Sequence, residues 1–151
     1  MPDAEADDTP DVIVRETGAG KFQNLVTVGR HHLIADEPEG HGGLDTGPSP
    51  YDLLGAALGA CTTMTLRMYA ERKGLPLDRA SVTVDHRKAH EQDMERMMDE
   101  AEAKPDIFTR TIALEGELTE EQRGKLMAIA DRCPVHRTLE RGSSVTTEAA
   151  R

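Results

Sequence analysis

Two sulfur nucleophiles are the residues with the clearest chemical potential in this chain. Cys61 and Cys133 are its only cysteines, and they lie far apart in a sequence of 151 residues. Such a pair could form a redox couple. One thiolate would attack an oxidant and become a sulfenic acid, the other would resolve it to a disulfide, and an external thiol would restore both. No Cys-x-x-Cys motif is present, so two distant cysteines alone are weak evidence for a redox couple.

The surroundings of Cys61 in the sequence favour two opposite interpretations. It lies within 53–66, where no side chain is charged, and apolar burial works against the thiolate. One interpretation is that Cys61 is a small core hydrophobe. The other is that the fold brings a cation against it, and the candidate cations are Lys21, Arg30, His31, His32, His136 and Arg137.

Cys133 has a different sequence environment. Pro134 fits the first position of a helix, which would leave the sulfur at the cap, near free backbone N–H groups that lower a thiol pKa. Arg132, His136 and Arg137 add positive charge nearby. The alternative is a cysteine tucked under a helix turn, and the residues leave both possibilities open.

The helix that must carry Cys61 has clear start and stop signals. Ser49 can act as N-cap, Pro50 occupies the first helical position, and Asp52 can complete a capping pair. The helix is predicted to reach Arg72 or Lys73 and to end at Gly74. Because it is apolar nearly all round, we expect it to be buried in the core.

Alternating apolar residues and turn signals predict an α+β fold around this helix. Three strands should form an antiparallel meander before a glycine-rich loop at 37–48, and three more should follow the helix. A capping box at 119–122 predicts another helix, and a short one should follow Cys133. The segment 91–104 is either a short helix or an insert. The strands are expected at 12–14, 22–28, 32–35, 80–86, 108–114 and 144–147.

Composition narrows the class of protein and its partners. The formal net charge of −10 disfavours nucleic acid and anionic membranes as partners. The longest apolar run is too short to span a bilayer, and the acidic N-terminus is the opposite of a secretory signal, so a cytoplasmic location is expected. Residues 1–10 are predicted to be a disordered acidic tail, and residues 11–151 a single domain.

Three segments together resemble one protein family. They are Gly-Gly-x-Asp-x-Gly-Pro-Ser-Pro-Tyr-Asp-Leu-Leu within 42–54, Ala-Ala-Leu-Gly-Ala-Cys at 56–61, and Cys-Pro-Val-His-Arg-Thr-Leu at 133–139. In this order they resemble the OsmC/Ohr family of thiol peroxidases, and the OsmC-like branch more than the organic hydroperoxide resistance proteins proper. The similarity covers nearly the whole chain from about Val12 onward.

The resemblance implies a fold, an activity and roles for both cysteines. It implies antiparallel sheets packed on a central helix, in an intertwined homodimer whose active sites lie near the subunit interface. It also implies a peroxidase that reduces organic hydroperoxides with a dithiol reductant and without a metal or organic cofactor. Cys61 would be the peroxidatic cysteine and Cys133 the resolving one, through an intramolecular disulfide. The apolar walls around Cys61 would bind the alkyl part of the peroxide.

The match departs from the family at the start of the helix. Better-known members use an Arg–Glu pair to hold the thiolate, with Glu directly after the proline, where this chain has Tyr51 and then Asp52. Asp52 is a possible supporting residue, although capping is its expected role, and Arg30 is the expected cation, with Lys21 the second choice. The alternative function is an OsmC-like stress or small-molecule-binding protein with little or no peroxidase activity.

Overall fold

The computed structural model describes residues 11–87 and 106–150. The chain divides into two compact units, Met1–Leu53 and Leu54–Arg151, which are described separately below. The acidic tail predicted at 1–10 and the charged segment at 91–104 lie outside the described residues. That residues 11–151 form one domain stays a prediction.

The first unit contains the predicted antiparallel meander. Its strands are β1 (Val12–Glu16), β2 (Asn24–Val28) and β3 (His31–Ala35), and β2 is the central strand. The register aligns Val26 of β2 with Val14 of β1 on one side and with Leu33 of β3 on the other. The turn between β2 and β3 uses Gly29 at φ 57°, a conformation that glycine adopts without steric cost.

Asp36 organises the loop that follows β3. Its carboxylate is buried and accepts hydrogen bonds from the Thr46 hydroxyl at 2.5 Å and from the backbone N–H groups of Glu37, Leu44 and Thr46. These bonds, with the Thr46 hydroxyl the largest contributor, lower the pKa of Asp36 against the opposing effect of burial. The loop also contains a short 3-10 helix, η1 (Glu39–His41).

Helix α1 (Pro50–Lys73) begins and ends as the sequence predicts. Asp52 Oδ2 accepts a hydrogen bond from the Ser49 N–H at 2.9 Å, and the Asp52 N–H donates to Ser49 Oγ at 3.2 Å, which confirms the capping pair. Gly74 ends the helix at φ 64°.

Burial of α1 within this chain is limited to one stripe. The fully covered side chains are Leu58, Thr62, Leu66 and Ala70, which recur every four residues. Met64 and Met68 on another face are 70% and 59% exposed. The prediction that α1 is buried on all sides therefore holds only for that stripe, because one chain supplies packing to one side of the helix.

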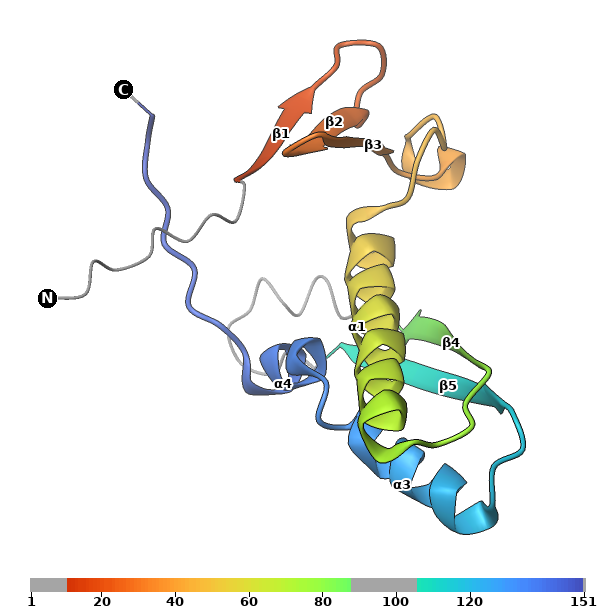
Figure 1. The fold of residues 1–151 in the computed structure, drawn as a ribbon. Helices are drawn as coiled ribbons and strands as arrows, with labels where there is room; N and C mark the ends of the chain where they lie inside the picture. Colours follow the sequence, from red (N-terminus) through yellow and green to blue (C-terminus); the bar gives the residue numbers. More distant parts are fainter. Residues whose placement is uncertain (1–10, 88–105, 151) are drawn as a thin grey trace, which may run out of the picture. The chain divides into compact units, whose positions relative to one another are not determined.

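The second unit packs α1 against a two-stranded antiparallel sheet (Figure 1). Its strands are β4 (Arg79–Arg87) and β5 (Ile107–Glu115), and both alternate exposed and half-buried residues along their length. Gly55 and Gly59 of α1 both face the Val84 side chain of β4, and Gly59 also lies near Val82, so no helix side chain separates α1 from these valines. The inward face of β5 carries Phe108, Arg110, Ile112 and Leu114.

Two further helices complete the second unit. Helix α3 (Glu120–Ala130) begins with the predicted capping box between Thr119 and Gln122, and its Leu126 and Ala130 pack on Leu66, Ala70 and Leu77 to form the core. Helix α4 (Pro134–Arg141) follows at once. The predicted strand at 144–147 is wrong: residues 142–150 have no regular secondary structure, and no strand within 11–87 or 106–150 pairs with them.

Candidate active site

The fold brings the two cysteines together, although most of the second unit separates them in sequence. Cys61 lies in the middle of α1 and is half-buried, whereas Cys133 lies between α3 and α4 and is fully buried. Each thiol shifts the pKa of the other, and both are free thiols in this structure. Because each thiol affects the pKa of the other, the two side chains lie near one another, as a redox pair requires.

Cys133 occupies the helix cap that the sequence predicts. Its Sγ accepts a hydrogen bond from the His136 N–H at 3.4 Å, and Pro134 takes the first helical turn. Burial opposes ionisation of this thiol. Hydrogen bonds from the Cys61 thiol, the His136 N–H, the Thr62 hydroxyl and the Val135 N–H outweigh burial, so the pKa of Cys133 lies below its ordinary value.

The pKa of Cys61 is shifted in the opposite direction. Burial raises it most, and the hydrogen bond and charge interaction with Cys133 raise it further. The two hydrogen bonds that lower it come from neutral groups, the Val135 N–H and the Thr65 hydroxyl. Within the second unit, Cys133 is therefore the sulfur whose surroundings favour negative charge.

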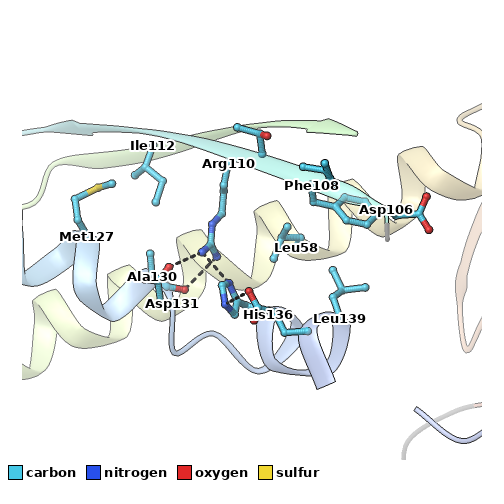
Figure 2. A pocket seen from close by; sticks show the side chains of 13 residues that line it. Leu58, Asp106, Phe108, Arg110, Ile112, Met127, Ala130, Asp131, His136 and Leu139 are labelled. Atoms are coloured by element: carbon cyan, nitrogen blue, oxygen red, sulfur yellow. Dashed lines mark hydrogen bonds and ion pairs between the residues drawn. The ribbon is translucent and has the colours of Figure 1, made fainter. Parts of the chain in front are cut away.

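Arg110 joins the elements that carry the two cysteines. Its side chain is 10% exposed and reaches from β5 to the end of α3 and to α4 (Figure 2). Nη1 donates to Thr62 Oγ1 at 3.0 Å and to the Ala130 carbonyl at 3.1 Å. Nη2 lies 3.0 Å from Asp131 Oδ1 and 2.9 Å from His136 Nδ1. The planar fork of a guanidinium suits this arrangement, and a lysine would not reproduce it.

Arg110 is absent from the cations that the sequence suggested. A signal for it was nevertheless present. The inward face of β5 alternates through Phe108, Ile112 and Leu114, and Arg110 occupies the same face. A charged residue at an inward-facing strand position needs buried partners, and that requirement marks it as a candidate for a polar network.

A cavity of about 610 Å³ adjoins this network. Its walls are partly apolar, from Leu58, Phe108 and Ile112 among others, and Arg110 and His136 supply polar groups (Figure 2). Neither cysteine belongs to its lining, so this cavity differs from the apolar pocket that the sequence led us to expect around Cys61.

The other predicted site residues lie elsewhere. Arg30 is in the turn between β2 and β3, and Lys21 lies 4.8 Å from the centre of the Phe22 ring. Both belong to the first unit, as does the Asp52 cap. The parts suggested for these three residues in activating Cys61 stay predictions. Of the remaining candidate cations, the structure places His136 at the site, where its backbone contacts Cys133 and its ring contacts Arg110.

No helix among the described residues is both long enough and apolar enough to cross a membrane.

Comparison with known proteins relates residues 40–148 to the family described as OsmC-like protein. No curated protein matches the chain. Solved structures share the fold at low sequence identity. An OsmC-like protein from Mycoplasma pneumoniae is 15% identical, with a TM-score of 0.70 over 89% of both chains. An organic hydroperoxide resistance protein OsmC from Legionella pneumophila is 21% identical, with a TM-score of 0.59 over 89% of this chain and 91% of that one. The organic hydroperoxide resistance protein OhrB of Bacillus subtilis is also 21% identical, with a TM-score of 0.57 over 88% and 91%.

Proposed function

Because this chain belongs to the OsmC-like protein family, we propose that it is a thiol-dependent peroxidase that reduces organic hydroperoxides to alcohols. The observation that carries the proposal is the proximity of Cys61 in α1 to Cys133 at the cap of α4, where each thiol shifts the pKa of the other. Several similar structures are named organic hydroperoxide resistance proteins, which supports this class of substrate.

The first step is assigned to Cys61, the more accessible sulfur. Its thiolate attacks the terminal oxygen of the hydroperoxide and the O–O bond breaks. The alkoxide leaves and takes up a proton to become the alcohol, while Cys61 becomes a sulfenic acid. Two electrons pass from the sulfur to the peroxide, so no metal or organic cofactor is needed.

The second step is assigned to Cys133. Its thiolate attacks the sulfur of the Cys61 sulfenic acid, an S–S bond forms, and the departing hydroxide takes up a proton to become water. A dithiol reductant then reduces the disulfide and is itself oxidised to a disulfide. The lowered pKa of Cys133 supports this assignment, because the thiolate is the attacking species.

The proposal includes a homodimer that acts in the cytoplasm. The family resemblance supports the dimer, and so do the exposed apolar side chains on α1.

Two observations favour the second candidate, a stress or small-molecule-binding protein with little peroxidase activity. The pKa of Cys61 is raised, and the cavity beside Arg110 contains neither cysteine. A thiol that stays protonated near neutral pH attacks peroxide slowly. The two candidates predict different rates for the same assay.

The test is peroxide consumption by the reduced protein. Cumene hydroperoxide and a dithiol are supplied to wild type, Cys61→Ser and Cys133→Ser, with Thr63→Val as a control on the same helix. We expect Cys61→Ser to abolish catalysed consumption and Thr63→Val to retain it. Equal consumption by wild type and Cys61→Ser would falsify the enzyme assignment.

Mass spectrometry tests the role of Cys133 separately. After one equivalent of peroxide, wild type should contain a Cys61–Cys133 disulfide. Cys133→Ser should instead accumulate Cys61 sulfinic acid as more peroxide is added. If wild type contained only over-oxidised Cys61, Cys133 would not be the resolving cysteine.

A further inference from the structure

Helix α4 begins at the cap made by Cys133 but has little packing of its own to hold it in place. None of its eight residues is fully buried. Its first turn nevertheless places a donor on the sulfur, because the His136 N–H donates to Cys133 Sγ at 3.4 Å. A contact that ties this turn to the rest of the second unit would therefore also hold the donor on the sulfur.

Arg110 on β5 makes such a contact. Its Nη2 lies 2.9 Å from Nδ1 of the His136 ring (Figure 2). The guanidinium is itself firmly placed, because its side chain is 10% exposed and it bonds to three further groups. Nη1 donates to Thr62 Oγ1 and to the Ala130 carbonyl, and Nη2 also donates to Asp131 Oδ1. The four N–H hydrogens on the two Nη atoms thus meet four acceptors.

The chemistry of the guanidinium decides which nitrogen of the His136 ring carries the proton. A guanidinium has only donors, so the ring nitrogen that faces it must accept, and Nδ1 carries no proton. The proton of the neutral ring is then on Nε2, which lies 3.3 Å from Glu140 Oε1. The two ring nitrogens therefore face partners that suit the same tautomer.

We propose that Arg110 is a positioning residue for Cys133: it holds the His136 ring as the Nε2–H tautomer and so keeps the His136 N–H on the sulfur. The ring and this N–H belong to one residue, so a ring held at Nδ1 restricts the backbone that bonds to Cys133. The inference rests on the proposed peroxidase function, in which Cys133 must reach the Cys61 sulfenic acid in the second step.

Nitrogen-15 NMR of the histidine rings in the reduced, full-length protein measures the tautomer directly. At neutral pH we expect an unprotonated Nδ1 and a protonated Nε2 for His136. Arg110→Met keeps an unbranched side chain but loses the donors, so the ring should gain a population that is protonated at Nδ1. A proton on Nδ1 in wild type, or an unchanged ring spectrum in Arg110→Met, would overturn the proposal.

Two substitutions of His136 test the same bond without removing the arginine. The amide oxygen of Asn can take the place of Nδ1 and accept from Arg110, whereas Gln places its amide near the position of Nε2. Exchange of the Arg137 amide hydrogen, which bonds to the Cys133 carbonyl in the same turn, reports whether the turn is held. We expect this exchange to be about tenfold faster in His136→Gln than in His136→Asn. Equal exchange in the two variants would overturn the proposal.

Disulfide formation after one equivalent of cumene hydroperoxide connects the Arg110–His136 bond to the reaction. Mass spectrometry of quenched samples should show the Cys61–Cys133 disulfide forming several-fold more slowly in His136→Gln than in wild type. In His136→Asn it should form at nearly the wild-type rate, which is rescue by the variant that keeps the acceptor. Thr138→Val, at an exposed position of α4, is the control for altered packing of the helix.

The outcomes separate this inference from the proposed function. If wild type formed no disulfide, the peroxidase would be contradicted, and the ring tautomer and amide exchange would still decide the role of Arg110. Equal slowing in Glu140→Gln would assign the effect to the Nε2 side of the ring and would overturn the inference. Equal slowing in Thr138→Val would assign it to the packing of α4 and would overturn the inference as well.

Discussion

Cys61 and Cys133 affect each other's pKa but differ in what else surrounds each sulfur. Cys133 meets backbone N–H groups at a helix start and a buried hydroxyl, and all of these favour a thiolate. For Cys61, burial has the largest effect, and it favours the thiol. Within the second unit, the surroundings therefore favour a thiolate at Cys133, the proposed resolving cysteine, more than at Cys61, the proposed peroxidatic cysteine.

This asymmetry predicts the pH dependence of the first turnover. The pKa of Cys61 lies above its ordinary value of 9.0, so the thiolate is scarce near neutral pH. Below that pKa the thiolate fraction grows about tenfold for each pH unit, and the rate of peroxide attack should grow with it. The measurement is peroxide loss by pre-reduced protein in a single turnover, at a series of pH values.

The control for this profile is the Arg30→Ala variant. A profile already flat at neutral pH in wild type would contradict a raised pKa. If the rate rose with pH in Arg30→Ala but not in wild type, Arg30 would be the cation that lowers the pKa of Cys61. If Arg30→Ala matched wild type, another group would supply the charge.

The sequence predicted the position of Cys133 better than its network. Pro134 marks the start of α4 and so places the sulfur at the cap. This relation is local, so three residues are enough to predict it. Arg110 was missed because its partners come from α1, α3 and α4, and no local pattern connects them. Its inward position on β5 was the available signal.

At the scale of elements, strong local signals gave the right boundaries. The Ser49–Asp52 and Thr119–Gln122 caps fix the starts of α1 and α3, and Gly74 fixes the end of α1. The predicted strand at 144–147 failed because alternating residues form a strand only where another strand pairs with them.

The Asp36 loop permits a prediction about stability. The pKa of Asp36 is lowered in the folded protein, chiefly by the Thr46 hydroxyl. Its stabilising contribution is therefore present above the ordinary value of 3.8 and is lost as the pH falls below it. Asp36→Asn replaces an acceptor oxygen by an amide that faces donors from Leu44 and Thr46.

Unfolding by urea at several pH values measures this effect. Asp36→Asn should be less stable than wild type at neutral pH, and the difference should shrink in acid, where wild type loses the same interaction. Asp85→Asn is the control, because Asp85 is an exposed strand residue whose nearest cation, Arg87, is also exposed. A difference that stayed constant down to strongly acidic pH would contradict a role for the Asp36 charge.

At the scale of the whole molecule, the outer face of α1 is the feature that one chain leaves incomplete. Cys61 lies seven residues after Leu54, three before Met64 and seven before Met68, so these side chains share one side of the helix. Leu54, Met64 and Met68 are 41%, 70% and 59% exposed. Such an apolar face is typical of a surface that a partner covers.

We therefore expect the proposed homodimer to use this face. A charge at Met64 would be buried there without a partner, so Met64→Glu should weaken association by about tenfold or more. Sedimentation across a range of protein concentrations measures the dissociation constant. Met127→Glu on α3, where the side chain is 46% exposed, is the matched control. A monomeric wild type, or equal weakening by both variants, would contradict dimerisation through this face.

The cap at Cys133 has a consequence for motion as well as for chemistry. The sulfur that would close the disulfide is also the acceptor that begins α4. A thiolate holds the first turn by its charge, whereas a disulfide sulfur is neutral and accepts hydrogen bonds weakly. Oxidation would loosen the start of α4, the helix that leads into the irregular segment 142–150. The C-terminal end would then be less well ordered in the oxidised protein than in the reduced one. A reductant could distinguish the two forms by this difference in shape before it contacts the sulfur.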